Sequence, residues 1–432
     1  MPQTAADLPL SESSREWLVG SDPVQRKRHG QYLTPRPVAD ALVDRVRLRP
    51  GMKVLDPGAG TGELLAAVAR REPGAELFGW DIDPAALEAA GRLVPDAGLL
   101  RRSALEPPGP GQAGYDLVIA NPPYFQVRVT PQLKARFGEV ISGRANVFAL
   151  FFKAGLDLLV PGGELAFIVP PSMNSGAYFE ALREHIIERA GITDLTLLEG
   201  SGVFEGANTA AQLLVLEKSG AGKGFVFEHA EPEAGFRRVV FSESPELLRQ
   251  GFEGRRTLWQ LGYEAVTGTV VWNQRRADLR PSPGAGTVPL VWSRDLRGGA
   301  FAASQRRSGN GSGRGRAKPG YIRSDRRMSG PALLVNRVIG AVGRGEIRTA
   351  FMPDGTEFLA ENHVNVIRLR LDRDAPDRPG LDWDRLQRAI EAPGTGDRAR
   401  LLTGNTQLSA TELTHLLPVR AAPPPRGLRA AG

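Results

Sequence analysis

Hydrophobic and polar positions follow two alternating periods over the first half of the chain. Short apolar runs that end at Gly, Pro, Asp or Asn are typical of buried strands, and the segments between them repeat apolar residues every three or four positions, as amphipathic helices do. Strands are expected at 52–57, 75–83, 115–120, 162–172, 192–199 and 211–218, and helices at 62–71, 84–93, 146–159 and 177–189. This alternation predicts an α/β fold with a Rossmann-like, doubly wound, mostly parallel sheet.

The pattern changes near residue 220. Segment 218–224, rich in Gly and Lys, is typical of a linker. Beyond it, strand-like pieces are expected at 224–230, 269–274, 332–340 and 363–371, and helices at 382–392 and 408–419. We therefore expect an N-terminal leader over 1–24, an α/β domain over 25–219 and a mixed α+β domain over 220–432.

Composition narrows the class of protein. The 432 residues are 41% hydrophobic and 24% charged, and no apolar run is long enough to cross a membrane. The absence of cysteine excludes disulfides and thiolate metal sites, and the five scattered His residues have no metal-ligand spacing. The N-terminus lacks the layout of a signal peptide, so we expect a cytoplasmic protein without a resident metal.

Charged residues are distributed unevenly between the two halves of the chain. Residues 1–219 carry 22 Lys and Arg against 26 Asp and Glu, whereas residues 220–432 carry 33 against 22. Such an excess of cations indicates a polyanionic partner for the second half. The basic, Gly- and Ser-rich segment 304–327 is expected to be a flexible loop, although a solvated loop without a partner would look similar. The candidate phosphate contacts are Arg306, Arg307, Arg314, Arg316, Arg323, Arg326 and Arg327.

A glycine-rich turn follows the first strand in "VLDPGAGTGELL". Gly58, Gly60 and Gly62 would let the backbone approach a ligand closely. Asp56, which precedes the glycines, would repel a pyrophosphate but suits a ligand with an ammonium group. Asp81 ends the second strand where related folds hydrogen-bond a ribose. A plain turn in an α/β protein would also contain such glycines.

The strand 115–120 ends in "NPPY", residues 121–124. The Asn121 side-chain oxygen and the Pro122 carbonyl can both accept hydrogen bonds from a planar amino group, which localises the nitrogen lone pair for attack. Pro122 and Pro123 would hold these acceptors rigidly, and Tyr124 offers a flat face for a planar base. An ordinary turn at the end of a strand is the alternative.

Together these motifs resemble class I S-adenosylmethionine-dependent methyltransferases, in particular the gamma group of DNA adenine-N6 methyltransferases. The glycine-rich turn resembles motif I, "NPPY" motif IV, "GQYLTP" (30–35) motif X and 203–220 motif VIII. Patches of the tail resemble Eco57I-like and BsuBI/PstI-like restriction–modification methylases. The resemblance implies a seven-stranded sheet and a C-terminal DNA target-recognition domain. It implies cofactor contacts at Tyr32, Thr34, Pro35, Asp56, Pro57, Gly58, Gly60, Gly62, Asp81, Ile82, Ser103 and Asn121.

The family pattern has two further consequences. In the motif VIII region an aromatic residue packs on the flipped adenine opposite the motif IV tyrosine, and Phe204 matches that place, although a core Phe would also fit there. Ser103 stands where the family often has an acid that contacts the adenine of the cofactor.

We therefore expect a site-specific methyltransferase that uses S-adenosylmethionine to modify adenine N6 in duplex DNA, with Asn121, Pro122, Pro123 and Tyr124 as catalytic residues. A separate restriction endonuclease acting on the same site is the expected partner. Methylation of RNA or of a protein glutamine is the nearest alternative. A non-catalytic DNA-binding module is the alternative from another class of protein.

Overall fold

The computed structural model of the chain describes residues 9–28, 30–143, 145–198, 211–296, 299–300, 318–337, 346–370, 382–403 and 407–420. The chain forms two compact units. The first contains residues 1–228 and 238–245, and the second contains residues 229–237 and 246–432.

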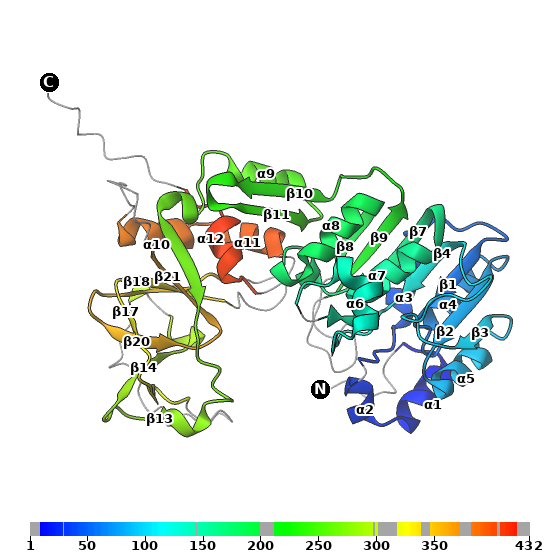
Figure 1. Cartoon of the computed structure of the whole chain (residues 1–432), viewed down its shortest axis with the longest axis horizontal. Coiled ribbons are helices and arrows are strands. Elements are labelled where there is room, and N and C mark those ends of the chain that lie inside the picture. The colour runs from blue at the N-terminus through cyan, green and yellow to red at the C-terminus, as the bar shows by residue number, and fades with distance from the viewer. Residues whose placement is uncertain are drawn as a thin grey trace. The chain divides into compact units, whose positions relative to one another are not determined.

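The first unit is built on a seven-stranded sheet in the order β3-β2-β1-β4-β7-β9-β8 (Figure 1). Its strands are β1 (Lys53–Asp56), β2 (Glu76–Asp81), β3 (Gly98–Arg101), β4 (Tyr115–Ala120), β7 (Leu159–Val169), β8 (Ala190–Leu198) and β9 (Ala211–Lys218). Strand β9 is antiparallel to both of its neighbours, and the other pairs are parallel. This topology confirms the predicted mostly parallel α/β sheet.

Helices cover both faces of this sheet. They are α1 (Glu12–Gly20), α2 (Pro23–Arg28), α3 (Arg36–Val43), α4 (Glu63–Arg71), α5 (Pro84–Leu93), α6 (Pro131–Phe137), α7 (Val147–Leu158) and α8 (Glu180–Arg189), with a small ladder of β5 (Gln126–Val127) and β6 (Ala145–Asn146). Alternate residues of β4 pack in two different hydrophobic clusters. Leu117 and Ile119 pack in the cluster of α3 and α4, whereas Val118 and Ala120 pack in that of α7 and α8.

The carboxyl ends of β1, β2 and β4 meet at one edge of the sheet because these strands are parallel. Asp56 ends β1, Asp81 ends β2 and Asn121 follows β4. In open α/β sheets, ligands bind at this edge where the strand order reverses, and here the order reverses between β1 and β4. The fold therefore brings three polar residues that are distant in sequence to one place.

The second unit contains two five-stranded sheets, β12-β21-β18-β19-β15 and β13-β16-β14-β20-β17. Its strands are β12 (Tyr263–Thr267), β13 (Leu279–Arg280), β14 (Thr287–Val291), β15 (Gly299–Ala300), β16 (Tyr321–Arg323), β17 (Met328–Ser329), β18 (Ala332–Asn336), β19 (Thr349–Met352), β20 (Glu357–Ala360) and β21 (Val364–Leu369). Side chains of both sheets share one hydrophobic cluster, which holds the sheets together. Helices α10 (Trp383–Glu391), α11 (Thr395–Thr403) and α12 (Ala410–His415) pack on a second cluster with the first sheet.

The chain passes between the two units in the hairpin of β10 (Val226–Glu231) and β11 (Phe236–Phe241) and in α9 (Pro245–Phe252). The linker-like segment 218–224 therefore leads directly into a strand of this hairpin. The two expected C-terminal helices are confirmed as α10 and α12. Asp382 caps α10, and Ser409 and Glu412 form a capping box at α12.

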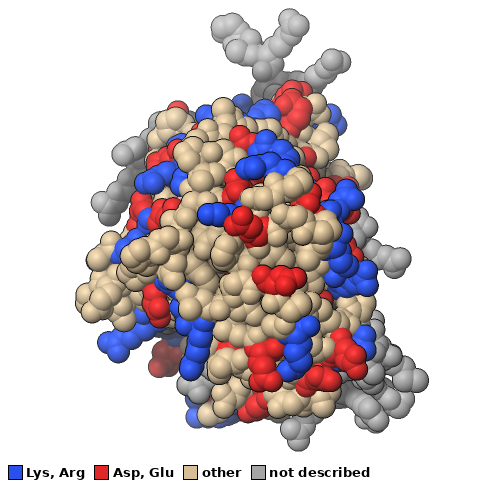
Figure 2. All heavy atoms as spheres, turned by 90° about the vertical axis from the view of Figure 1, so that its right-hand side faces the viewer, with Lys and Arg blue, Asp and Glu red and all other residues tan. Residues whose placement is uncertain are grey.

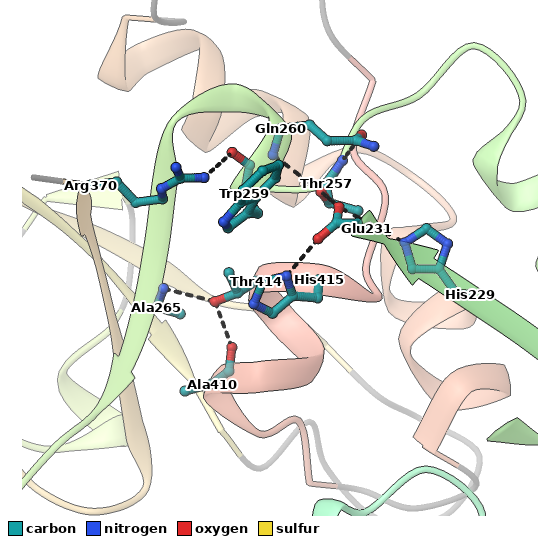
Figure 3. Close-up of polar contacts among 10 residues, drawn as sticks. All are labelled: His229, Glu231, Thr257, Trp259, Gln260, Ala265, Arg370, Ala410, Thr414 and His415. Carbon is teal, nitrogen blue, oxygen red and sulfur yellow. Dashed lines mark hydrogen bonds and ion pairs between the residues drawn. The ribbon is translucent and has the colours of Figure 1, made fainter. Parts of the chain in front are cut away.

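A buried carboxylate near the start of the second unit contacts the last helix that the structure describes (Figure 3). Glu231 lies 2.5 Å from Nδ1 of His415, which is 184 residues later, and it also accepts a hydrogen bond from the Thr257 hydroxyl. The His415 ring stacks on Phe236 with a centroid separation of 4.3 Å. This cluster ties the hairpin to α12, the last helix that the structure describes.

One expectation about local structure was wrong, and one segment contains a helix that the sequence analysis did not assign. Residues 269–274 do not form a strand: Val270 makes one isolated bridge to Glu361, and the chain turns directly afterwards. The expected leader contains α1, since the Ser11 side chain caps the helix through the Ser14 backbone N–H and Leu18 buries against Leu10. Both segments depend on partners that are distant in sequence, which local patterns do not reveal.

Candidate active site

The turn between β1 and α4 presents bare backbone at the carboxyl edge of the sheet. Gly60 and Gly62 have φ angles of 51° and 88°, in the left-handed region that favours glycine. A Cβ on Gly62 would lie 3.2 Å from Ala90 Cα, so glycine permits the close approach of α4 and α5. A Cβ on Gly60 would have no neighbour within 4 Å. Gly60 thus leaves space that a ligand can occupy.

Asp56 ends β1 directly before this turn. It is 1% exposed, and it accepts a hydrogen bond from the Gly58 N–H at 3.0 Å. Burial raises the pKa of Asp56 to about 8, although the Gly58 hydrogen bond acts in the opposite direction. Within the described part of the chain, no Lys, Arg or His lies within ion-pair distance of this carboxyl group. A buried acid without a cationic partner suits a ligand that carries an ammonium group.

Asp81 connects the glycine-rich turn to the next helix. Its Oδ2 accepts a hydrogen bond from the Gly60 N–H at 2.8 Å, and its Oδ1 accepts one from the Asp83 N–H at 2.9 Å. Asp83 in turn caps α5 by accepting from the Ala85 N–H at 2.9 Å. Burial raises the pKa of Asp81. Because a carboxylate has about four lone-pair positions, Asp81 can still accept hydroxyl groups.

Asn121 is held by the segment that precedes the first strand of the sheet. Its Nδ2 donates to the Tyr32 carbonyl and to Thr34 Oγ1, both at 3.2 Å. Its Oδ1 accepts from the Tyr124 hydroxyl at 2.8 Å. Both amide hydrogens therefore have acceptors, which fixes the side-chain oxygen on the side of Tyr124, with one lone pair left for another donor.

Tyr124 is oriented through its hydroxyl group. In addition to Asn121, the carbonyl of Ile168 in β7 lies 2.7 Å from this hydroxyl. The Tyr124 ring packs edge-on against Phe148, and its face is turned toward Tyr32 at a centroid separation of 6.4 Å and an interplanar angle of 29°. Burial raises the pKa of Tyr124, so the hydroxyl remains a neutral donor.

Gly30 explains why residues 30–35 can pack on residues 121–125. Its φ is 60°, and a Cβ at this position would lie 2.9 Å from the backbone nitrogen of Tyr124 and 3.1 Å from the Phe125 ring. No other residue type would allow this approach without displacement of the backbone. The contact brings Tyr32 and Thr34 to Asn121.

These elements surround one pocket with an empty volume of about 820 Å³, which includes space open to solvent. Eight of the residues expected to contact a cofactor line it: Tyr32, Pro57, Gly58, Gly60, Asp81, Ile82, Ser103 and Asn121. Thr34, Pro35, Asp56 and Gly62 are not among the lining residues; Thr34 contacts Asn121, and Pro35 is the N-cap residue before α3. Pro123 lines the pocket, whereas Pro122 and Tyr124 do not.

Ser103 lies in the pocket wall with its hydroxyl oxygen 3.1 Å from the Leu105 N–H, which donates to it. The hydroxyl can donate one hydrogen bond and accept another. Phe204, the expected second stacking residue, lies outside the described residues.

Several pocket residues were not predicted from the sequence. They are Trp17, Gly30, Gln31, Leu33, Ala86, Arg102, Ala104, Leu105, Phe125, Val147 and Phe151. Arg102 lies over the Trp80 ring at 4.3 Å, and Phe151 belongs to the buried face of α7. The amphipathic pattern identifies Phe151 as a core residue, but no local signal shows that this core borders a pocket.

Charged side chains lie on the surface of both units. On the face of the first unit seen in Figure 2, basic and acidic side chains are interspersed. In the second unit, Arg323 and Arg326 have no side-chain hydrogen bond or ion pair among the described residues, whereas Arg327 pairs with Glu357. The other arginines expected to contact phosphate, Arg306, Arg307, Arg314 and Arg316, lie outside the described residues.

Two features, a membrane-spanning helix and a metal-binding cluster, were sought within the described ranges. No helix in them is long and apolar enough to cross a membrane. They also contain no group of three His, Asp or Glu side chains that could hold a metal ion.

Comparison with known proteins finds similarity between the first unit and methylases of restriction–modification systems. Residues 98–204 match the family model described as Eco57I restriction-modification methylase. The chain is 29% identical over 230 residues to the type II methyltransferase M.TthHB8I of Thermus thermophilus, an alignment that covers 50% of this chain and 51% of the relative. The chain thus spans about half the length of such relatives. These matches confirm the resemblance drawn from the motifs.

Two further similarities are less specific. A release factor glutamine methyltransferase of Gloeobacter violaceus is 41% identical over 102 residues, which cover 22% of this chain and 35% of that protein. The crystal structure of the type IIG restriction endonuclease BpuSI aligns with 91% of this chain and 59% of its own, at 12% identity and a TM-score of 0.42.

Proposed function

We propose that this chain, whose first unit matches restriction–modification methylases, is a site-specific DNA methyltransferase that transfers a methyl group from S-adenosylmethionine to N6 of an adenine flipped out of duplex DNA. The observation that carries the proposal is the position of Asn121. Asn121 lines the same pocket as the glycine-rich turn and Asp81. In this position the side-chain oxygen of Asn121 could accept a hydrogen bond from a substrate amino group. An ordinary turn at the end of a strand has no need for an acceptor beside a pocket.

The chain's own residues would activate the target amine. Asn121 Oδ1 has a free lone pair, and the Pro122 carbonyl offers a second acceptor on rigid backbone. Two hydrogen bonds from an adenine amino group to these oxygens would localise the nitrogen lone pair. S-adenosylmethionine supplies a methyl group on a positively charged sulfur. The N6 lone pair forms the new C–N bond as the C–S bond breaks; the thioether leaves with that electron pair, and one amine proton passes to solvent.

The pocket fits the chemical groups of this cofactor. Asp56 does not line the pocket, but it directly precedes Pro57 and Gly58, which do, and as a buried acid without a cation it would suit the α-ammonium group. Asp81 lines the pocket and keeps lone pairs for ribose hydroxyls. The space beside Gly60 would accommodate part of the ligand. Ser103 can hydrogen-bond the adenine of the cofactor, although it can accept fewer donors than an acid. We assign Ile82 to apolar contact with the same ring, since its side chain is 59% exposed in the pocket wall.

The target base needs stacking partners because leaving the duplex costs a few kcal/mol. Tyr124 and Phe204 are the proposed pair. Tyr124 would keep one ring face toward the base while its hydroxyl holds Asn121 Oδ1. Adenine is the proposed target rather than cytosine because the motifs resemble those of adenine methyltransferases.

The second unit provides a surface suited to duplex phosphates. Within residues 272–296 and 318–327, eight Lys and Arg residues stand against three Asp residues. Strand register places Arg280 opposite Tyr321, and Arg323 opposite Thr287. Ile322 is fully buried in one face of this sheet, so its neighbours Tyr321 and Arg323 point to the other face. We propose that this face, with Arg326 and Arg327, contacts the phosphate backbone.

The biological role would be protection of host DNA in the cytoplasm. Restriction–modification systems pair a methylase with a nuclease of the same specificity, so a separate endonuclease is the proposed partner. It would act with this chain through the shared DNA sequence, without need for direct contact.

Protein glutamine is a second candidate substrate. The similarity to a release factor glutamine methyltransferase favours it, since a glutamine amide is also a planar amino group. The cation-rich second half favours DNA instead, because a protein substrate has no need for such a polyanion-binding region.

The test uses S-adenosylmethionine with a labelled methyl group and offers duplex DNA, RNA and nucleic-acid-free host protein to the full chain. We expect label in DNA, recovered as N6-methyladenine after digestion to nucleosides. Asn121→Ala serves as the matched control and is expected to abolish transfer while cofactor affinity changes by no more than a few fold. Label in RNA or protein alone would exclude the DNA proposal.

A further inference from the structure

Helix α1 forms part of the wall of the candidate cofactor pocket. Its residue Trp17 lines the pocket together with Gly60, Asp81 and Ile82. Figure 1 shows α1 beside α5, the helix that follows Asp81 and Ile82. None of the motifs in the sequence includes α1, and the family model matches residues 98–204, which lie outside it.

Specific hydrogen bonds hold α1 on the glycine-rich turn. The Ser14 hydroxyl lies 2.6 Å from that of Thr61 in a buried contact, and Thr61 stands between Gly60 and Gly62. The Ser11 N–H donates to Glu63 at 2.7 Å, in the first turn of α4. One contact involves the cofactor-type turn itself and the other the helix that follows it, so α1 and this turn keep a defined relative position.

The same face of α1, together with the residues that precede the helix, packs on the segment that holds Asn121. Leu10 and Leu18 form a small hydrophobic cluster with Leu33, and Trp17 packs against it. The Arg36 N–H also donates to the Pro9 carbonyl at 2.8 Å. Helix α1 therefore bridges the glycine-rich turn and the segment 30–35, the two parts of the chain that border the pocket.

Core packing alone does not explain Trp17. Leu18 is 6% exposed and Leu10 5%, so these two side chains bury the helix, whereas Trp17 is only half-buried. Residues 14, 17 and 18 lie on one face of the helix because they are three and four positions apart. The indole thus extends from the anchored face to the pocket, where Ile82 also leaves an apolar side chain 59% exposed. A half-buried indole and an exposed isoleucine in one pocket wall indicate a surface that a ligand covers.

We propose that Trp17 is a further cofactor-binding residue, which packs on bound S-adenosylmethionine and slows its release. The identity of the ligand rests on the proposed function. Helix α1 holds Trp17 in place through Ser14 and Thr61, so little side-chain freedom is lost on binding. Burial of the indole and of the ligand in one contact stabilises the complex by the hydrophobic effect.

The test measures binding of S-adenosylhomocysteine to the full chain by titration calorimetry and its dissociation by stopped flow. Trp17→Ala should weaken binding about tenfold, mainly through faster dissociation, which corresponds to about 1.4 kcal/mol. Trp17→Phe keeps an aromatic face and should remain within about threefold of the parent. Val19→Ala is the matched control, since Val19 is 77% exposed on the same helix and does not line the pocket; its binding should not change.

Tryptophan emission separates contact from a structural effect. The parent should show a change in emission when S-adenosylhomocysteine binds. Trp17→Phe should lose most of that change while it still binds, and Trp272→Phe, in the second unit, should keep it. Equal affinity and dissociation in Trp17→Ala and the parent, or an unchanged emission response in Trp17→Phe, would overturn the role of Trp17. If the parent itself binds no S-adenosylhomocysteine, the proposed function fails first.

Discussion

The Asn121 amide nitrogen donates to Thr34 Oγ1 at 3.2 Å across 87 residues of sequence. Thr34 is 5% exposed and does not line the pocket, so this contact is its principal role in the ligand-free protein. Because the hydrogen bond uses an amide hydrogen, it sets which end of the carboxamide faces the target amine. The segment before the sheet thus determines the orientation of the proposed catalytic residue.

Replacement of Thr34 should therefore reduce the chemical step more than cofactor binding. Thr34→Ala removes one acceptor of the Asn121 amide and should lower the single-turnover methylation rate about tenfold. Thr34→Ser retains the hydroxyl group and should recover most of the rate. Affinity for S-adenosylhomocysteine, measured by calorimetry, should stay within about threefold. A loss of affinity without a loss of rate would assign Thr34 to the cofactor instead.

Gly30→Ala should destabilise the first unit. The new Cβ would meet the Tyr124 backbone nitrogen at 2.9 Å, and the residue would keep a φ of 60°. We expect a loss of about 3 kcal/mol in free energy of unfolding, from the left-handed backbone and from displacement of residues 121–125. Gly51→Ala is the matched control, with a φ of 73° and no neighbour within 4 Å, and should cost about 1 kcal/mol. Denaturant unfolding measures both; equal losses would refute the close contact.

Cofactor binding should release a proton from Asp56. Its pKa is raised to about 8, so the group is mostly protonated at pH 7 in the ligand-free protein, and a nearby ammonium group favours ionisation. Affinity for S-adenosylhomocysteine should thus rise with pH from 6 to about 8. Above about pH 8 the ligand's own ammonium group loses its proton, and affinity should fall again.

Calorimetry in buffers of different ionisation enthalpy checks this linkage. At pH 7, Asp56 with a pKa of about 8 should release roughly 0.9 proton per bound ligand, and uptake of roughly 0.1 by the ligand's amino group leaves a net release of roughly 0.8. Asp56→Asn has no proton to release and should bind more weakly, with little dependence on pH between 6 and 7.5. Equal proton release in the variant and the parent would exclude Asp56 as the source.

Glu231 should make the second unit sensitive to acid. Burial disfavours its charge, but the nearby His229, with Nε2 3.9 Å from Oε1, and hydrogen bonds from His415 and Thr257 outweigh this effect and lower the pKa to about 2 (Figure 3). A carboxylate whose pKa is lowered on folding stabilises the folded state above its unfolded pKa, and this contribution is lost as pH falls from about 4.5 to 2. Glu231→Gln should lose about 2 kcal/mol at pH 7 and should show a weaker decline below pH 4.5.

Scanning calorimetry of the full chain from pH 7 to pH 3 measures this effect. Glu264→Gln removes an exposed ion pair with Arg368 and should change stability by less than about 1 kcal/mol. If Glu231→Gln and the parent lose stability in parallel on acidification, another group controls the transition.

The salt dependence of DNA binding tests the basic face of the second unit. Arg280→Ala and Arg323→Ala should each reduce the slope of log affinity against log salt by about 0.9, the value for one phosphate contact. Arg368→Ala is the control, because Arg368 is also exposed but pairs with Glu264. Fluorescence anisotropy with duplex DNA at several salt concentrations measures the slopes. If Arg368→Ala reduces the slope as much as Arg280→Ala and Arg323→Ala do, these arginines act through net charge alone.

Local patterns in the sequence determined the fold of the first unit and the positions of its polar strand ends. The strand ends at Asp56, Asp81 and Asn121 and the glycines of the turn were predictable because hydrophobic period, capping and left-handed turns depend on neighbouring residues. The capping box of α12 was predictable for the same reason. The roles of these residues toward cofactor and DNA remain predictions.

Only the tertiary structure decided which distant segments meet. Trp17 in an expected leader, the bond from Asn121 to Thr34, and the pair of Glu231 and His415 each join positions far apart in the chain. The strand expected at 269–274 failed for the converse reason, because a strand needs a partner ladder and Val270 finds only one bridge. Such contacts depend on packing of the whole core, where burial and hydrogen-bond satisfaction outweigh local preference.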